Sequence, residues 1–423
     1  MPDPAASAAP PLLPPDCGDR LMRRLDALAE ISESDGALTR RFATPEHRRA
    51  NDLVADWMRQ AGMAVHEDAI GNVIGRYEGE RPDRPAIMLG SHLDTVVDAG
   101  RYDGMLGVLS GLAVVEHLYA SGRRLPLAVE VIGFADEEGV RYQSTFLGSR
   151  ALAGALEASM LELVDRDGLA LGEALRAFGH DPERLADAIR PPGTLAAYLE
   201  VHIEQGPVLE HEGLGVGIVG AIAGATRLAV TVNGEAGHAG TVPMALRRDA
   251  LAAAAECVLA IESLCANDAE LVGTVGELEV VPGASNVIPG RVRFTVDLRS
   301  PRDARRHEAI AELERRFGEV AGRRGAEIAI EPVHAADGIV CDAAVTRHLE
   351  RAIADCGLEP RTLTSGAGHD AMVMAGLTRT GMIFVRCRGG VSHNPAESIT
   401  AEDAALGAEV LLRATLGIAA EAG

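Results

Sequence analysis

The motif GSHLDTVVDAGRYDG carries a histidine and two aspartates whose types and spacing suit a metal site. His92 stands where an apolar run ends, Asp94 follows two residues later and Asp103 eleven residues later. His92 can bind a divalent metal through one imidazole nitrogen, while Asp94 holds the other ring nitrogen from outside the ligand set. Asp103 can bridge two ions through its two carboxylate oxygens. A bridging carboxylate implies two metals.

Two adjacent glutamates, Glu137 and Glu138 in FADEEG, follow another apolar run. Adjacent carboxylates repel each other unless a cation stands nearby or one of them is protonated. Because neighbouring side chains point in different directions, Glu138 can bind a metal while Glu137 faces the attacking water as general base. The alternative interpretation is a solvated acidic turn.

Two further histidines complete the candidate metal set. His202 lies between two acids in LEVHIEQGPVLE, and His393 lies in the Gly-rich loop of GGVSHNPAES. With the aspartate shared, the predicted groups are His92, Asp103 and His202 for one ion, and Asp103, Glu138 and His393 for the other. Such a pair of ions lowers the pKa of bound water from about 15.7 toward 7 and polarises a scissile carbonyl. The predicted chemistry is hydrolysis rather than redox.

The elements that must position these side chains alternate between strands and helices. The runs GNVIGRYEG, PAIMLGSHLD and LAVEVIGFADEEG have the length of strands, and MLGVLSGLAVVEHLYASG has helical spacing. Strands that alternate with helices predict an α/β domain with a mostly parallel sheet, whose ligands gather beyond the carboxyl ends of the strands. His92 and the glutamate pair both stand where an apolar run stops.

A different pattern begins near Ala223 and ends near His334. It runs strand, helix, two strands, helix, strand, from TRLAVTVNGEAGHAGT to EIAIEPVH. This order predicts a ferredoxin-like α+β insert in which two helices cover a small antiparallel sheet. The segment after it returns to helix and strand patterns and is expected to rejoin the first sheet. The predicted divisions are a disordered leader at 1–19, a discontinuous catalytic domain at 20–222 and 335–423, and an inserted lid and dimerisation domain at 223–334.

Composition restricts the class of protein and its partners. The 423 residues exceed one ordinary hydrophobic core, and a formal net charge of −22 with 3% aromatic residues speaks against a nucleic-acid partner. No segment approaches the ~20 apolar residues of a membrane span, and the Ala/Pro-rich N-terminus has no secretory pattern. The six cysteines lie far apart without a C-x-x-C pair, which fits reduced thiols in a cytoplasmic enzyme.

In this order, the four motifs resemble the metal-dependent amidohydrolase branch of the aminoacylase/carboxypeptidase superfamily, the hydantoinase/carbamoylase branch. The resemblance runs from about Arg20 to Leu416. Peptidases of the wider superfamily usually place a carboxylate where this chain has His202, so HIEQGPVLE, GHAGTVPM and GAGHDAM indicate the ureido/carbamoyl branch. The resemblance implies a homodimer with two divalent ions per subunit, Zn²⁺ or Mn²⁺.

The resemblance also implies roles outside the metal set. Asn286 in GASNVIPG and Arg299 in VDLRS would anchor the substrate carboxylate, helped by Arg227 in GATRLAV. His238 in EAGHAGT would stabilise the oxyanion of the tetrahedral intermediate, in some members of the family in the partner's site. The other substrate-binding candidates are Gln205, Gly368 and His369. The simpler interpretations are a surface ion pair for Arg299, a turn for GHAG and a helix N-terminus for GAGHDA.

The predicted reaction is hydrolysis of a ureido or carbamoyl C–N bond in a small carboxylate substrate. Glu137 would take a proton from water and deliver it to the departing nitrogen, while closure of the insert excludes bulk water. VRYQSTFLGSRALAG and FVRCRGGVSHNPAES resemble allantoate amidohydrolases, so the first expectation is allantoate, cleaved to ureidoglycine, ammonia and carbon dioxide in purine catabolism. The alternatives are an N-carbamoyl-L-amino acid hydrolase or β-ureidopropionase, a dipeptidase or aminoacylase, and a catalytically silent binding protein. The complete set of ligands and base argues against the last.

Overall fold

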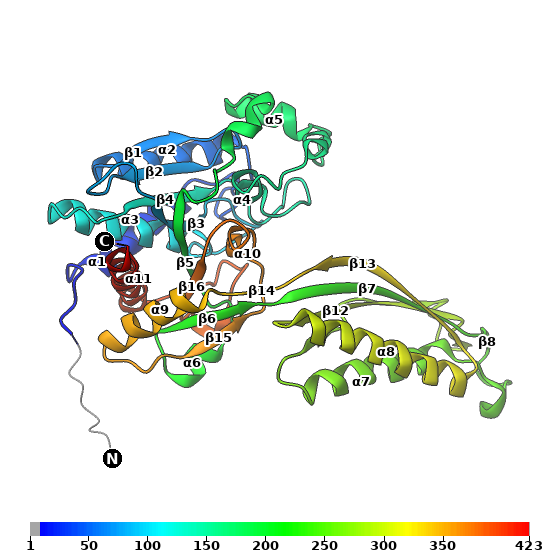
Figure 1. The fold of residues 1–423 in the computed structure, drawn as a ribbon. Coiled ribbons are helices and arrows are strands. Elements are labelled where there is room, and N and C mark those ends of the chain that lie inside the picture. Colours follow the sequence, from blue (N-terminus) through cyan, green and yellow to red (C-terminus); the bar gives the residue numbers. More distant parts are fainter. Residues whose placement is uncertain (1–8, 423) are drawn as a thin grey trace, which may run out of the picture. The chain divides into compact units, whose positions relative to one another are not determined.

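The computed structural model describes residues 9–422, and the chain divides into two compact units (Figure 1). The first unit holds the residues up to Gly220 and from Cys341 onward, and the second spans Ala221–Val340. The divisions predicted from the sequence fall after residues 222 and 334, two residues later and six residues earlier than those of the compact units. No helix among residues 9–422 is long and apolar enough to cross a membrane.

A nine-stranded mixed sheet is centred on the first unit, in the order β1-β2-β4-β3-β5-β16-β6-β14, with β15 paired to β6. Strands β4, β3, β5 and β16 run parallel to one another, and the flanking pairs are antiparallel. The predicted mostly parallel α/β sheet is therefore confirmed. The strand bounds are β1 Ala64–Glu67, β2 Val73–Tyr77, β3 Ala86–His92, β4 Ala128–Phe134, β5 Leu195–Ile203, β6 Val216–Ile222, β14 Ile339–Val340, β15 Thr362–Ser365 and β16 Thr380–Val385.

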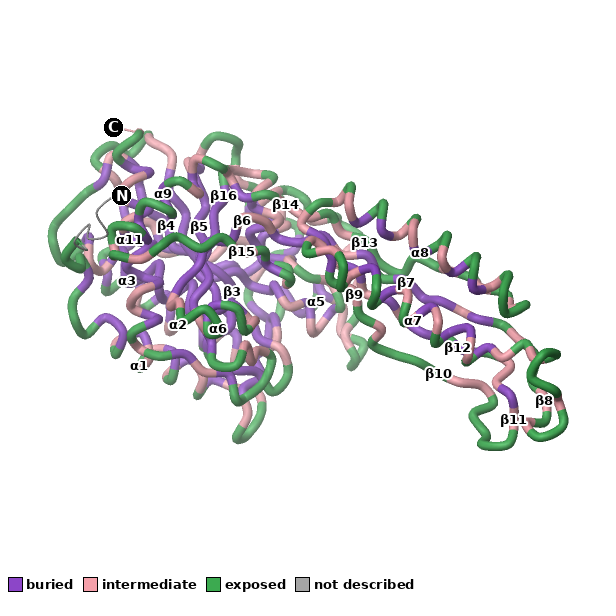
Figure 2. The backbone as a smooth tube through the Cα atoms, turned by 90° about the horizontal axis from the view of Figure 1, so that it is seen from below, coloured by how far each residue is buried: buried purple, intermediate pink, exposed green. Residues whose placement is uncertain are grey.

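Helices pack against this sheet and bury its central strands, which Figure 2 shows as almost continuously buried. Helix α3 contacts β3, β5, α1 and α11, so its apolar residues are buried nearly all round. The helix bounds are α1 Cys17–Ala29, α2 Pro45–Gln60, α3 Met105–Ala120, α4 Leu147–Leu152, α5 Leu171–Phe178, α6 Val208–Glu212, α9 Ala343–Asp355, α10 Asp370–Met374 and α11 Ala401–Glu421, with 3₁₀ turns η1 Ala158–Glu162, η2 Pro182–Ala188 and η4 Arg388–Gly390.

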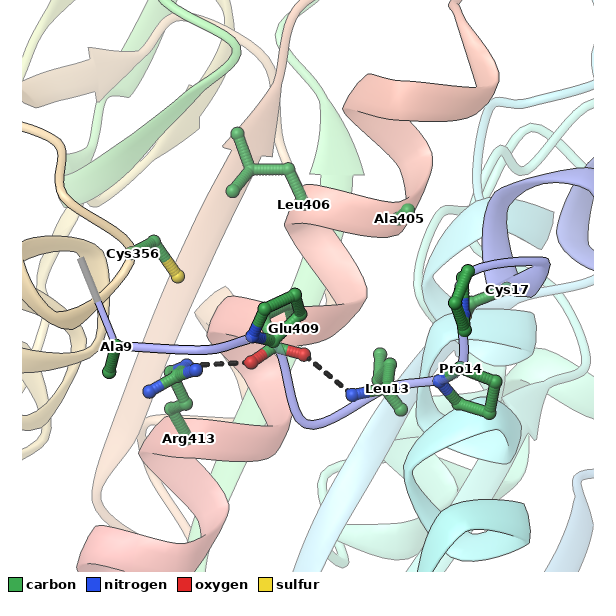
Figure 3. A pocket seen from close by; sticks show the side chains of 11 residues that line it. Ala9, Leu13, Pro14, Cys17, Cys356, Ala405, Leu406, Glu409 and Arg413 are labelled. Atoms are coloured by element: carbon green, nitrogen blue, oxygen red, sulfur yellow. Dashed lines mark hydrogen bonds and ion pairs between the residues drawn. The ribbon is translucent and has the colours of Figure 1, made fainter.

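The prediction of a disordered N-terminal leader is wrong for residues 9–19. Helix α1 begins at Cys17, and Leu13 before it is buried. Glu409 on α11 accepts the backbone N–H of Leu13 at 2.9 Å (Figure 3). An apolar side chain and a backbone donor thus find partners on α11, which the Ala/Pro composition of the segment does not reveal. Residues 1–8 of the predicted leader lie outside the described residues.

The second unit is a five-stranded antiparallel sheet with two long helices, in the order β10-β12-β7-β13 with β9 paired to β12. Along β12 alternate residues are buried, because one face of the sheet packs against α7 and α8. The predicted insert of two helices on a small antiparallel sheet is confirmed. Its elements are β7 Gly224–Asn233, β8 Gly237–His238, η3 Met244–Leu246, α7 Ala250–Ala266, β9 Val272–Thr274, β10 Leu278–Val281, β11 Val287–Ile288, β12 Arg291–Ser300, α8 Asp303–Arg324 and β13 Glu327–Ala336.

Candidate metal centre

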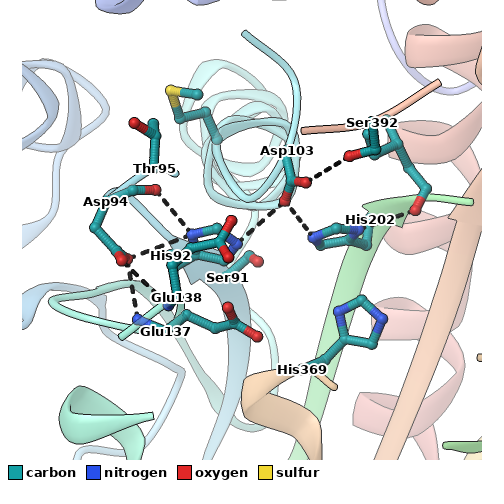
Figure 4. Close-up of polar contacts among 12 residues, drawn as sticks. Ser91, His92, Asp94, Thr95, Asp103, Glu137, Glu138, His202, His369 and Ser392 are labelled. Atoms are coloured by element: carbon teal, nitrogen blue, oxygen red, sulfur yellow. Dashed lines mark hydrogen bonds and ion pairs between the residues drawn. The ribbon is translucent and has the colours of Figure 1, made fainter. Parts of the chain in front are cut away.

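The carboxyl ends of four parallel strands bring the predicted ligands to one edge of the first unit's sheet. His92 is the last residue of β3, His202 lies near the end of β5, and Glu138 follows shortly after β4. His393 lies in the loop that follows β16. Because β4, β3, β5 and β16 are parallel neighbours, their carboxyl ends share an edge, and Figure 4 shows the loops after β3 and β4 meeting β5 there.

Asp103 stands at the centre of this group. Its Oδ1 lies 3.4 Å from His92 Nε2 and 3.0 Å from His202 Nε2, while its Oδ2 lies 3.3 Å from His393 Nε2. The Asp103, His92 and His202 side chains are almost fully buried, whereas that of His393 is 49% exposed. The two oxygens of one carboxylate therefore face two different sets of histidines, as a bridging ligand requires.

Three overlapping groups of side chains could each hold an ion, with one ligand atom per residue and all atoms of a group within 4.8 Å of one another. Two of the groups are the sets that the sequence predicts. The groups are His92, Asp103 and His202; Asp103, Glu138 and His393; and His92, Glu137 and Glu138. The third places the predicted base among possible ligands, so the assignment of Glu137 needs its own test.

Hydrogen bonds to backbone carbonyls fix which ring nitrogen of two histidines faces Asp103. His92 Nδ1 lies 3.0 Å from the Asp94 carbonyl, and His202 Nδ1 lies 2.9 Å from the Ile203 carbonyl. Since a carbonyl oxygen only accepts, each Nδ1 carries the proton and donates it. The lone pair of each Nε2 is then available on the side of Asp103, as a metal ligand requires.

Asp94 makes more hydrogen bonds in the site than the sequence predicts. Its Oδ1 lies 3.4 Å from His92 Nδ1, which agrees with the expected contact. The same carboxylate also accepts the backbone N–H of Glu137 at 3.0 Å and of Glu138 at 3.2 Å. One buried side chain therefore positions both the histidine after β3 and the two glutamates after β4.

The charges of the site are unbalanced in a way that fits a bound cation. Burial and the charge of Asp103 raise the pKa of Glu138 to about 7, and burial raises the pKa of Glu137 well above its ordinary value, with a further contribution from Glu138. The hydrogen bond to Asp103 raises the pKa of His393 to about 9. Buried carboxylates that raise each other's pKa are stabilised in their charged form by a cation between them, so the residues fit divalent metal ions.

Two predicted substrate-binding residues, Gln205 and His369, contact this group, and a third, Gly368, directly precedes His369. Gln205 donates from Nε2 to Asp103 Oδ2 at 2.7 Å. His369 is buried with its ring 4.4 Å from that of His202, and burial and the neighbouring His202 lower its pKa well below the ordinary value (Figure 4). At Gly368 an added Cβ would come within 2.8 Å of the Phe146 ring. Their contact with substrate stays a prediction.

Four other predicted site residues belong to the second unit. His238 lies on β8 opposite Val287, and its Nδ1 accepts the backbone N–H of Gly240 at 3.1 Å. The Asn286 backbone carbonyl accepts the N–H of Ala239 at 3.0 Å. Arg227 and Arg299 both bind the carboxylate of Asp297, which the sequence analysis did not single out.

The structure adds residues that sequence reasoning missed, above all Glu397 and Ser392. Glu397 is buried, and its Oε1 accepts the backbone N–H of Tyr102 at 2.8 Å and of Asp103 at 3.2 Å. Ser392 Oγ lies 2.8 Å from Asp103 Oδ2 and 3.1 Å from Glu397 Oε2. Both residues flank His393 in GGVSHNPAES, and this closeness in sequence is the signal that could have found them.

Glu200 and Asp370 are further buried acids that the sequence analysis passed over. Glu200, two residues before His202 on β5, accepts the hydroxyl of Ser91 at 2.7 Å and the backbone N–H of Ala371 at 3.1 Å. Asp370 directly follows His369 and is fully buried at the start of α10. Glu200 thus ties α10 to the ends of β3 and β5. Glu200 and His202 stand two residues apart on β5, so their side chains point to the same face of the sheet. This spacing could have identified Glu200 from the sequence.

The model of peptidase family M20/M25/M40 matches residues 88–416. An N-carbamoyl-L-amino acid amidohydrolase of Geobacillus stearothermophilus is 46% identical to this chain, over 93% of this chain and 97% of that protein. A probable allantoate deiminase of Oryza sativa subsp. japonica is 44% identical, over 91% of this chain and 85% of that protein. The crystal structure of a hydantoinase/carbamoylase family amidase from Burkholderia multivorans gives a TM-score of 0.90 at 36% identity, covering 95% of this chain and 98% of that chain.

These similarities confirm the family resemblance that the four motifs carry. They span both units and include the segments that hold every predicted metal ligand. With a matching family model over most of its length and amidohydrolase relatives over more than nine tenths of it, the chain belongs to peptidase family M20/M25/M40, in its metal-dependent amidohydrolase branch.

Proposed function

We propose that this protein is a two-metal amidohydrolase that cleaves a ureido C–N bond of a small carboxylate substrate, with allantoate as the first candidate. The observation that carries the proposal is the buried Asp103 carboxylate, whose two oxygens face His92 and His202 on one side and His393 on the other. The pair of glutamates after β4 supplies a further ligand, Glu138, and a separate base, Glu137.

The proposed ligands follow from the donor atoms that the fold gathers. One ion would be held by His92, Asp103 and His202, and the other by Asp103, Glu138 and His393. When bound, the ions acidify a water molecule and polarise the scissile carbonyl. Imidazole and carboxylate donors in this mixture suit Zn²⁺ or Mn²⁺.

Glu137 is the proposed general base and general acid, which carries out both proton transfers. Its backbone N–H donates to Asp94 at 3.0 Å and its side chain is buried, so the folded core of the unit positions it. Burial raises the pKa of Glu137, which favours a group that must first accept a proton from water and then release it. The proton passes to the departing nitrogen, which leaves as the amine. The carbamate that is released breaks down to ammonia and carbon dioxide.

Two substrate classes are supported by relatives of similar identity. The probable allantoate deiminase of Oryza sativa subsp. japonica and an allantoate deiminase of Arabidopsis thaliana are each 44% identical to this chain, and an N-carbamoyl-L-amino acid amidohydrolase of Geobacillus stearothermophilus is 46% identical. Both substrates place a carboxylate close to a ureido carbon. We put allantoate first because the segments after FADEEG and around His393 resemble those of allantoate amidohydrolases, and N-carbamoyl-L-amino acids second.

A turnover panel tests the substrate. We expect enzyme reconstituted separately with Zn²⁺ and Mn²⁺ to release ammonia from allantoate faster than from N-carbamoyl-L-amino acids, N-carbamoyl-β-alanine or ureidoglycolate. Chelation should abolish turnover and added metal should restore it, because the acidified water depends on the ions. Faster turnover of N-carbamoyl-L-amino acids would establish the second candidate. Release of amino acids from dipeptides or acyl amides, without ammonia from any ureido compound, would contradict the proposal.

Glu397→Gln should weaken metal binding by about 10- to 100-fold, because Glu397 accepts the backbone N–H groups of Tyr102 and of Asp103, the proposed bridging ligand. Competition with a chromophoric chelator measures the affinity. The matched control is Glu204→Gln, a buried glutamate that accepts the N–H groups of Val208 and Leu209 at the start of α6. Equal affinities of the two variants would show that Glu397 does not position the site.

The remaining features of the proposal come from the family resemblance. We propose a cytoplasmic homodimer in which Arg227, Asn286 and Arg299 bind the substrate carboxylate and His238 stabilises the oxyanion. Gln205, Gly368 and His369 would complete the substrate contacts. Sedimentation equilibrium of the metal-loaded protein tests the dimer, and a single monomeric species at micromolar concentration would contradict it.

A further inference from the structure

Three charged side chains form a chain of ion pairs on the second unit's sheet. Arg227 on β7 stands directly opposite Asp297 on β12 in the antiparallel register, and Arg299 follows two residues later on β12. Asp297 Oδ1 accepts from Arg299 Nε at 2.8 Å, and its Oδ2 accepts from Arg299 Nη2 at 3.0 Å and from Arg227 Nε at 3.1 Å. One carboxylate therefore binds both guanidinium groups.

The alternation of β12 puts this triad of Arg227, Asp297 and Arg299 on the sheet face away from the helices. Val296 and Leu298 are buried in the core with α7 and α8, so the residues between them point to the other face. Side-chain exposure is 55% for Arg227, 27% for Asp297 and 31% for Arg299. Arg227 is thus the most exposed of the three side chains, and Asp297 and Arg299 are covered to a similar extent.

A cavity of about 390 Å³ in the second unit is lined by Arg227 and Asp297. Its other polar lining residues are Thr274, Thr295 and Glu277. Burial disfavours the charged form of Asp297, yet hydrogen bonds from Arg299 and Arg227 outweigh it and lower the pKa of Asp297. Asp297 is therefore ionised at neutral pH, and the triad carries one net positive charge beside the cavity.

We propose that Asp297 is a positioning residue for a carboxylate receptor, which holds Arg227 and Arg299 in the orientation that receives the single carboxylate of a ureido acid. The inference deepens the proposed function and rests on it for the identity of the ligand. Two arginine side chains without a carboxylate between them repel each other and lose rotamer order. A guanidinium binds a carboxylate through a planar fork, so its orientation decides the affinity.

The opposing interpretation is that Asp297 is only a competing negative charge. In that case its removal would make the receptor more positive and strengthen carboxylate binding. Glu277 separates the two interpretations, because it lines the same cavity, and its backbone N–H donates to the Thr295 hydroxyl at 3.1 Å. Asp297→Asn and Glu277→Gln each remove one negative charge, but only the first removes the bridge between the arginines.

The test measures binding of N-carbamoylglycine, the simplest ureido acid, by calorimetry. Each variant is made in a metal-loaded Glu137→Gln background so that the ligand is not consumed, and thermal unfolding verifies the fold. We expect Asp297→Asn to weaken binding about tenfold, Glu277→Gln to leave it unchanged or tighten it, and Asp297→Glu to recover part of the loss. In the active enzyme, Asp297→Asn should raise KM about tenfold with kcat within about twofold.

The possible outcomes distinguish a failure of the positioning role of Asp297 from a failure of the proposed hydrolysis. Binding to Asp297→Asn that is as tight as to Glu277→Gln would overturn the positioning role, and so would an intact triad that binds no N-carbamoylglycine. If the variants bind as expected while the parent enzyme releases ammonia from no ureido acid, the receptor stands and the proposed hydrolysis fails.

Discussion

Glu137→Gln should lower kcat by about a thousandfold or more while both metal ions remain bound. The substitution keeps the size of the side chain and leaves the backbone N–H, which donates to Asp94, unchanged. What it removes is the carboxylate that we propose accepts a proton from water and returns it to the departing nitrogen. Metal content by emission spectroscopy and single-turnover kinetics on the substrate identified in the panel measure the two effects separately.

Glu138→Gln gives the contrast that assigns the two glutamates. Glu138 is 3.4 Å from His393 Nε2 and belongs to the group with Asp103, so its loss should release one ion as well as lower the rate. Glu204→Gln is the control for a buried glutamate near the site and should keep both the ions and the rate. Loss of an ion from Glu137→Gln would contradict the assignment and favour ligation by His92, Glu137 and Glu138.

The parts of the site that sequence could predict are those with a local pattern. His92 closes the apolar run of β3 and the glutamate pair follows that of β4, because buried parallel strands have continuous apolar runs that end where the site begins. These two endings in one domain were enough to predict that their side chains gather beyond the carboxyl ends of the strands. The order strand, helix, two strands, helix, strand likewise predicted the sheet of the second unit.

The contacts that escaped prediction join residues that are far apart in sequence. Glu397 binds the backbone of Asp103 across 294 residues, and the carboxylate of Asp94 reaches the backbone of Glu137 across 43. Such bonds leave no period in either segment, so only the register of the strands and the course of the loops reveal them. The same holds for Glu409, whose bond to the N-terminal segment overturned the prediction of disorder there.

The ion pairs of Asp297 are a further feature that could not be predicted from the sequence. The motif VDLRS marks Arg299 through its resemblance to a family, and GATRLAV marks Arg227, but their common partner depends on the pairing of β7 with β12. A shift of one residue in that register would turn Arg227 and Asp297 to opposite faces. The proposed receptor therefore depends on the register of β7 and β12 and not on either motif alone.

Asp103→Asn should abolish activity, with a loss of about ten-thousandfold or more, and leave less than one ion per subunit. Asp103 is the one residue shared by both predicted ligand groups, and its two oxygens face three histidines. Asparagine keeps one oxygen but loses the charge that offsets two cations. His393→Ala removes a ligand of only one group and should leave one ion, while the exposed His211→Ala, on α6, should leave two. If Asp103→Asn and His393→Ala retained the same number of ions, Asp103 would serve a single metal and the bridging role would be wrong.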